Sequence, residues 1–121
     1  MAKIMIIDNN NLVRRVIGPE IQELGHKVQF VDHLSFYDIL KAVRESMPSL
    51  VILDCLLPCC NSETLVRALR EDPSLKGLKV LAFSAQHDAE TVEHMLDRGV
   101  DGFVFKGHTA TLITRIQELI N

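Results

Sequence analysis

A chain of 121 residues can bury one hydrophobic core but is too short for two domains of ordinary size, so we expect one domain over residues 1–121. The formal net charge of −3 argues against direct binding to nucleic acid or to an anionic membrane, and a composition of 47% hydrophobic and 24% charged residues is typical of a soluble globular protein. No apolar run reaches the length of a signal-peptide core or a membrane span, which predicts a cytoplasmic location.

The three cysteines, Cys55, Cys59 and Cys60, lie within six residues of one another. Their odd number and close spacing do not predict a disulfide framework. A zinc site is disfavoured because no histidine stands at ligand spacing and the ligands do not form the regular pairs typical of such sites. The five histidines are scattered over separate segments and are expected at the surface.

Short apolar runs alternate with segments of helical periodicity along the chain. The apolar runs suit strands that are covered on both faces, and they predict strands over residues 3–7, 27–31, 50–53, 79–83 and 102–105. Apolar residues three and four apart predict helices over residues 12–24, 35–46, 62–71, 89–98 and 109–120. The first of these helices contains Gly18-Pro19, and because proline lacks a donor N–H we expect a kink or a split there.

Strands that alternate with helices specify an α/β fold, in which right-handed crossovers cover both faces of a parallel sheet. In this length the pattern predicts a flavodoxin-like, doubly wound sheet of five parallel strands in the order 2-1-3-4-5, with five helices. The first and third strands are then neighbours, so Asp8 and Asp54, which follow them, should meet at the carboxyl edge of the sheet. Ser84 and Lys106 end the fourth and fifth strands at the same edge. One crevice would collect two carboxylates, a hydroxyl and an ammonium group.

Four short motifs at these strand ends occur in the order and at the spacing of a known family. They are Ile6-Ile7-Asp8-Asn9-Asn10, Val51-Ile52-Leu53-Asp54 followed by Leu57-Pro58, Ala82-Phe83-Ser84-Ala85, and Phe103-Val104-Phe105-Lys106. On these motifs the chain resembles, from Met1 to Asn121, the receiver domain of two-component response regulators. The resemblance implies that Asp54 accepts a phosphoryl group from a phosphohistidine on a sensor histidine kinase or phosphotransfer protein. The signal would then pass to a downstream protein target.

The resemblance also implies a magnesium site around the acceptor. Its ligands would be Asp8, Asn9, Asp54 and the backbone carbonyl of Leu56, which are oxygen ligands of the kind that Mg²⁺ prefers. The ion would neutralise charge on the phosphoryl oxygens, since phosphoryl transfer depends mostly on positioning and electrostatic stabilisation.

Three further residues take roles by the same resemblance. Lys106 would place a positive charge near the phosphoryl oxygens, and the Ser84 hydroxyl would hydrogen-bond to the phosphoryl group. Phe103 would turn inward as the switch residue of a protein-binding face that comprises the fourth helix, fifth strand and fifth helix. Such a domain is a phosphoacceptor in signalling and not an enzyme, although it can catalyse its own phosphotransfer and dephosphorylation.

Three positions depart from the family pattern. Asn9 stands where the family usually has a second acidic residue, so we predict weakened Mg²⁺ binding that Asn9→Asp would strengthen. Gly107 stands where the family typically has proline, which removes the expected cis peptide turn after Lys106. No glycine occurs near Ser62, where the family often has a tight turn, and we expect Asn61 to adopt the left-handed conformation instead.

Alternatives from other classes are also considered. A degenerate receiver would keep the fold and bind proteins without phosphorylation, which Asn9 and Gly107 favour modestly; phosphate incorporation from acetyl phosphate, lost in Asp54→Asn, would discriminate. An aspartyl-nucleophile phosphatase of the haloacid dehalogenase type is disfavoured, because Leu56 stands where that chemistry needs a second Asp as general acid. A flavin-binding flavodoxin is disfavoured because the first strand leads into Asp-Asn-Asn and not into a glycine-rich phosphate loop.

Overall fold

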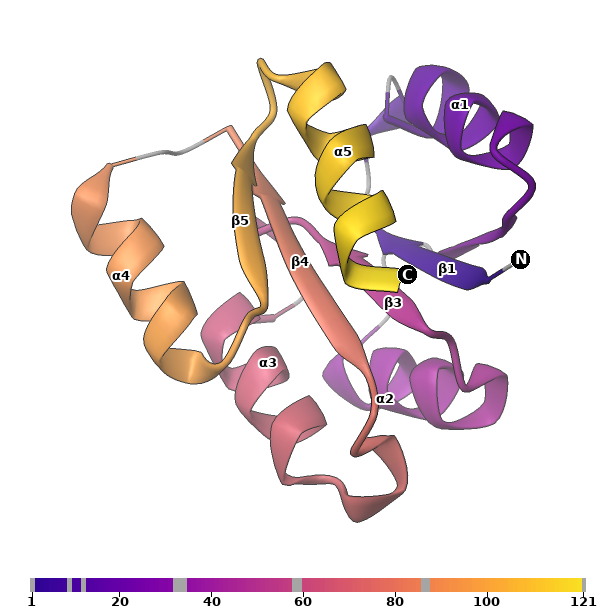
Figure 1. Cartoon of the computed structure of the whole chain (residues 1–121). Coiled ribbons are helices and arrows are strands. Elements are labelled where there is room, and N and C mark those ends of the chain that lie inside the picture. Colours follow the sequence, from indigo (N-terminus) through magenta and orange to yellow (C-terminus); the bar gives the residue numbers. More distant parts are fainter. Residues whose placement is uncertain are drawn as a thin grey trace.

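The computed structural model of the protein describes residues 2–8, 10–11, 13–31, 35–57, 60–85 and 88–120. At its centre is one sheet of five parallel strands in the order β2-β1-β3-β4-β5, with helices on both faces (Figure 1). The strands are β1 (Lys3–Ile7), β2 (Lys27–Val31), β3 (Leu50–Leu53), β4 (Lys79–Ser84) and β5 (Gly102–Phe105). The predicted doubly wound, flavodoxin-like architecture and its strand order are confirmed.

Two hydrophobic clusters, one on each face of the sheet, hold the helices in place. The helices are α1 (Gly18–Glu23), α2 (Phe36–Ser46), α3 (Ser62–Glu71), α4 (Ala89–Arg98) and α5 (Thr109–Ile120), with a 3-10 turn, η2 (Pro73–Leu75), after α3. Helices α1 and α5 cover one face, and α2, α3 and α4 cover the other (Figure 1). Successive strand residues point to opposite faces, so Ile4 and Ile6 pack under α1 and α5 while Met5 and Ile7 pack on the other side. No helix in the described part of the chain is long and apolar enough to span a membrane.

The helix predicted over residues 12–24 is split, as the Gly18-Pro19 pair indicated. A π-helical turn, η1 (Val13–Ile17), runs directly into α1, and Pro19 stands in the first turn of α1. Proline is tolerated there because the first N–H groups of a helix have no intrahelical partner. Gly18 allows α1 to approach β2, since a Cβ atom on it would lie 2.5 Å from Cζ of Phe30. Leu12 lies outside the described residues.

The start of α3 differs from the prediction. Asn61 is not left-handed; it has φ −80° and ψ 121°, and its side-chain oxygen accepts a hydrogen bond from the N–H of Thr64 at 3.0 Å. An extended N-cap residue satisfies an N–H group that the helix leaves unpaired, and this stabilises the extended conformation over a left-handed turn. A left-handed conformation occurs instead at Met47, with φ 50°, where α2 ends.

Candidate functional site

The two predicted carboxylates leave neighbouring strands at the carboxyl edge of the sheet. Ile7 pairs with Leu53 in the β1–β3 ladder, and the N–H of Asp54 extends that ladder by donating to the carbonyl of Ile7 at 3.0 Å. Asp8 and Asp54 therefore follow the strands side by side. Both side chains are almost fully buried, with 1% of Asp8 and 7% of Asp54 exposed.

Lys106 joins the two carboxylates. Its Nζ atom lies 2.9 Å from Oδ2 of Asp8 and 3.3 Å from Oδ2 of Asp54, and only 17% of its side chain is exposed. The backbone places it there: the N–H of Lys106 donates to the carbonyl of Ser84 at 2.8 Å, which continues the β4–β5 ladder past the end of β5. The sequence pattern and the structure thus agree in bringing Asp8, Asp54 and Lys106 together.

Electrostatics at Asp54 are dominated by burial. Burial raises the pKa of Asp54 above its ordinary value, and the neighbouring Asp8 carboxylate adds to the rise. The N–H of Leu56, which donates to Oδ1 of Asp54 at 3.0 Å, and the Lys106 ammonium lower the pKa, but burial and the Asp8 carboxylate together outweigh them. Oδ1 of Asp8 accepts a hydrogen bond from the N–H of Asn10 at 2.8 Å. Two buried carboxylates thus lie at the edge of the sheet, with the Lys106 ammonium between them.

A comparison with known families agrees with this geometry. Residues 4–117 match the family model of the response regulator receiver domain. The chain belongs to this family. It is a receiver domain of the two-component response regulators, as the strand-end motifs predicted.

Relatives of this receiver domain are found among proteins and among solved structures. The virulence transcriptional regulatory protein PhoP of Salmonella typhimurium is 26% identical to this chain over 121 residues. The match covers 99% of this chain and 52% of PhoP, so the chain spans about half the length of the curated relatives it matches. Chemotaxis response regulator CheY4 of Vibrio cholerae superposes with a TM-score of 0.87 at 20% identity over 98% of both chains. The receiver domain of a Pseudomonas aeruginosa sensor histidine kinase, solved with a magnesium ion in its active-site cleft, has a TM-score of 0.84 at 20% identity and covers 98% of this chain and 97% of its own. At these identities the structural likeness shows the fold alone.

The receiver's carboxylate edge fits a hard cation. Oδ2 of Asp8 is buried and makes no hydrogen bond of good geometry, although the Lys106 ammonium pairs with it. A buried anionic oxygen of this kind is what Mg²⁺ prefers as a ligand. Within the described residues no group of three or more His, Cys, Asp or Glu side chains could hold a metal ion. The predicted ligands in this range are the carboxylates of Asp8 and Asp54 and the backbone carbonyl of Leu56. Asn9, the remaining predicted ligand, lies outside the described residues.

Gly107 follows Lys106 in a turn that has no cis peptide bond, and none occurs elsewhere in the described residues. The N–H of His108 donates to the carbonyl of Phe105 at 2.9 Å and closes this turn. A Cβ atom on Gly107 would lie 2.7 Å from Cε2 and 3.1 Å from Cδ2 of the Phe105 ring. The aromatic ring thus occupies the space that a side chain at position 107 would need, which gives a physical reason for glycine in place of the family's proline.

Ser84 and Phe103, the two predicted switch positions, lie on neighbouring strands. Ser84 is completely buried at the end of β4, and Ala82 of β4 pairs with Phe103 of β5. Phe103 is half-buried and packs against the hydrophobic cluster that lies between the sheet and helices α2, α3 and α4. The structure places these residues on the side of the sheet that faces α4, and their roles in switching stay predictions.

Ser62 was not identified as a site residue from the sequence. Its buried hydroxyl lies 2.8 Å from the carbonyl oxygen of Cys55 and 3.0 Å from that of Asp54, and it donates to them. The first residue of α3 therefore connects α3 by hydrogen bonds to the start of the loop between β3 and α3, residues 54–61. The one signal in the sequence was the absence of the family's glycine near Ser62, and a side-chain hydrogen bond across the loop could not be predicted from spacing.

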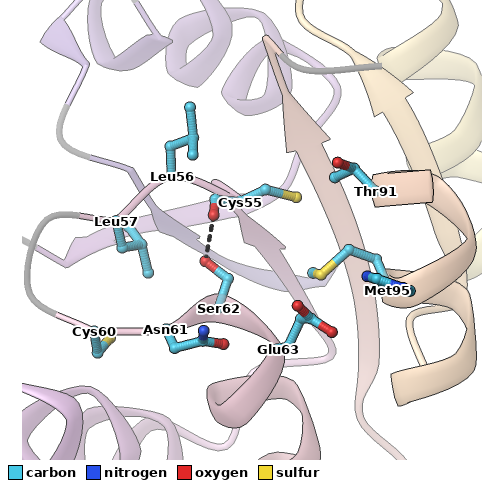
Figure 2. A pocket seen from close by; sticks show the side chains of 10 residues that line it. Cys55, Leu56, Leu57, Cys60, Asn61, Ser62, Glu63, Thr91 and Met95 are labelled. Atoms are coloured by element: carbon cyan, nitrogen blue, oxygen red, sulfur yellow. Dashed lines mark hydrogen bonds between the residues drawn. The ribbon is translucent and has the colours of Figure 1, made fainter. Parts of the chain in front are cut away.

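A cavity of ≈ 310 Å³ lies between this loop and α4 (Figure 2). Figure 2 shows that α4 contributes Thr91 and Met95 to it from the side opposite the loop. Leu56 directs its side chain outward and is 53% exposed. The cavity's other walls include Cys55, Cys60, Ser62 and Glu63. Cys55 is a free thiol, while Pro58 and Cys59 lie outside the described residues.

Proposed function

We propose that residues 1–121 act as one receiver domain in which Asp54 accepts a phosphoryl group from a phosphohistidine on a sensor histidine kinase or phosphotransfer protein. The observation that carries this proposal is the convergence of the Asp8 and Asp54 carboxylates on the Lys106 ammonium, 2.9 and 3.3 Å away. The family match supports it, because receiver domains work with these partners. The domain acts as a phosphoacceptor, and not as an enzyme on a separate substrate.

In the proposed reaction an ionised oxygen of Asp54 attacks phosphorus and forms an acyl phosphate. The bond between phosphorus and the donor's imidazole nitrogen breaks, and its electron pair returns to the imidazole ring, which takes up a proton. Because this transition state is stabilised mainly by position and charge, the chain's contribution is a fixed acceptor and a nearby cation. The N–H of Leu56, 3.0 Å from Oδ1, orients the acceptor, and Lys106 stands ready to contact the phosphoryl oxygens.

Asp8, Asp54 and the backbone carbonyl of Leu56 would hold Mg²⁺, with Asn9 contributing a neutral amide oxygen. When bound, the ion supplies positive charge that offsets the negative charge of the phosphoryl oxygens. Lys106 must then share Asp8 with the metal, since it pairs with Oδ2 of that residue.

Weak metal binding is the expected consequence of Asn9. We expect Asn9→Asp to bind Mg²⁺ more tightly than the wild type in a calorimetric titration, because an anionic ligand replaces a neutral one. Asn10→Asp adds the same charge one residue further along and is the matched control. Equal affinities of Asn9→Asp and the wild type would contradict the assignment.

Phosphorylation is proposed to switch a face that a downstream protein binds. The Ser84 hydroxyl would move toward the phosphoryl group and hydrogen-bond to it. Because Phe103 has no hydroxyl, the change on β5 would come from packing alone. Beryllofluoride, a phosphoryl mimic, should shift the NMR amide signals of Phe103 and of residues 92–96 in α4. Unshifted signals in a protein that binds the mimic would rule out this switch.

The proposal is tested by incubating the protein with acetyl phosphate and Mg²⁺ and measuring its intact mass. We expect one added phosphoryl group in the wild type and in Asp97→Asn, a control that changes an exposed carboxylate of α4. Asp54→Asn and wild type with the metal chelated should gain none. An unmodified wild type would favour a receiver that binds its partners without phosphorylation.

A further inference from the structure

The two buried carboxylates each use their two oxygens differently. Oδ1 of Asp54 accepts a hydrogen bond from the N–H of Leu56 at 3.0 Å, and Oδ1 of Asp8 accepts one from the N–H of Asn10 at 2.8 Å. Oδ2 of Asp54 and Oδ2 of Asp8 lie 3.3 Å and 2.9 Å from Nζ of Lys106. The backbone bond to Oδ1 therefore fixes how the Asp54 carboxylate is turned and which oxygen it presents to the ammonium group.

The N–H that orients Asp54 belongs to the peptide group between Cys55 and Leu56. The other polar atom of that group, the carbonyl oxygen of Cys55, accepts a hydrogen bond from the Ser62 hydroxyl at 2.8 Å (Figure 2). No cis peptide bond occurs in the described residues, and in a trans peptide group the C=O and the N–H point in opposite directions. Turning this peptide group would thus break the bond to Ser62 and the bond to Asp54 together.

Ser62 is held in place by the helix that it begins. It is the first residue of α3 and is only 5% exposed, so water does not compete for its hydroxyl. The hydroxyl also lies 3.0 Å from the carbonyl oxygen of Asp54, so its one proton is shared between two successive carbonyl groups. Helix α3 packs on the sheet through Leu65, Val66 and Leu69, which are completely buried. The hydroxyl is therefore fixed against the segment that carries the acceptor.

We propose that Ser62 is a positioning residue for phosphorylation. Its hydroxyl holds the peptide group between Cys55 and Leu56, and that peptide group holds the Asp54 carboxylate in the orientation in which it attacks phosphorus. This inference rests on the proposed function. Phosphoryl transfer depends mainly on how the reacting groups are placed, so a carboxylate that is free to turn should react more slowly.

Removing the hydroxyl should slow phosphorylation without abolishing it. With acetyl phosphate and saturating Mg²⁺, we expect the initial rate of phosphorylation of Ser62→Ala to be roughly three- to tenfold below that of the wild type, the worth of one net hydrogen bond. Ser62→Cys fills the same space with a weaker donor and should also be slowed. Ser62→Thr keeps the hydroxyl and should retain the wild-type rate. Intact mass gives the rates, at a temperature at which circular dichroism shows every variant to be folded.

Asn61→Ala separates this role from a purely structural one. Asn61 caps the same helix, with its side-chain oxygen 3.0 Å from the N–H of Thr64, so its loss weakens the start of α3 but leaves the Ser62 hydroxyl in place. This variant should be phosphorylated at the wild-type rate.

A second readout needs neither metal nor phosphoryl donor. The bond to the Asp54 carboxylate shifts the NMR signal of the Leu56 amide proton downfield. This signal should move upfield in metal-free Ser62→Ala and Ser62→Cys, but not in Asn61→Ala.

An unmoved Leu56 signal in Ser62→Ala and Ser62→Cys would overturn the inference and leave the proposed function intact. So would Ser62→Ala and Ser62→Cys proteins that are phosphorylated as fast as Asn61→Ala. A wild type that gains no phosphoryl group would overturn both the inference and the proposed function.

Discussion

Replacing Gly107 with alanine tests how the turn that carries Lys106 is built. The new Cβ atom would stand 2.7 Å from Cε2 and 3.1 Å from Cδ2 of Phe105. Carbon atoms in favourable contact are about 3.5–4.0 Å apart, so either the ring or the turn must move. Gly77→Ala is the matched control, because nothing lies within 4 Å of a Cβ atom at that position.

The size of the effect follows from what can move. The Phe105 ring is half-buried and makes an edge contact with His108, with 5.3 Å between ring centroids, so it can swing aside at the loss of that contact. Overpacking costs about 1–3 kcal/mol, and the mobile ring places Gly107→Ala in the lower half of that range. The alanine also reduces the entropy of the unfolded chain, which offsets about 0.4–1 kcal/mol. We therefore expect a net loss of about 1 kcal/mol and a Tm lower by roughly 3–5 °C.

Thermal unfolding followed by circular dichroism measures this effect. Gly77→Ala should match the wild type or melt slightly higher. In the Phe105→Ala background the ring is absent, so adding Gly107→Ala should be neutral or stabilising. If Gly107→Ala costs as much in that background as alone, or melts like Gly77→Ala, the ring does not decide the residue at position 107.

Four further expectations follow from individual contacts. The side chain of Arg44, whose Nε lies 2.5 Å from Oδ2 of Asp72, holds the pKa of Asp72 at about 2. The stability that this pair contributes is therefore present above pH 4 and is lost as the pH falls toward 2. Urea titrations should show this loss in the wild type and much less of it in Arg44→Ala. Burial raises the pKa of Asp54, so its ionisation opposes folding, and calorimetry should find Asp54→Asn more stable than the wild type at pH 7 but not at pH 3. Ser62→Ala loses the bonds to two loop carbonyls and should lower the free energy of unfolding by about 1–3 kcal/mol in urea titrations. The raised pKa of Cys55, about 11 against 9.0, leaves about a hundredfold less thiolate, so mass spectrometry should find iodoacetamide labelling of Cys55 at pH 8 far slower than that of a free cysteine.

The arrangement of the sheet could be predicted because it depends on few properties of the chain. Short apolar runs alternating with amphipathic segments leave one architecture in 121 residues, and parallel strands present their carboxyl ends at one edge. The convergence of Asp8, Asp54 and Lys106 follows from that topology. The split in the first helix was also predictable, since the missing N–H of Pro19 is a local property.

Contacts that depend on where a side chain points could not be predicted. The left-handed conformation expected at Asn61 was wrong, because the residue's side chain caps α3 and favours an extended backbone. The packing of Phe105 against Gly107 depends on the direction of one ring, and the bonds of Ser62 depend on the path of the loop. The hydrophobic pattern and the spacing of motifs carry no information on the direction of a ring or on the path of a loop.

The central claim is that Asp54 carries the phosphoryl group, and locating that group tests it most directly. After incubation with acetyl phosphate and Mg²⁺, borohydride reduces an acyl phosphate to the alcohol of homoserine, which tandem mass spectrometry of a digest can place in the sequence. We predict reduction at position 54 and at no other carboxylate. Reduction at Asp8 instead, or at no position, would contradict the account.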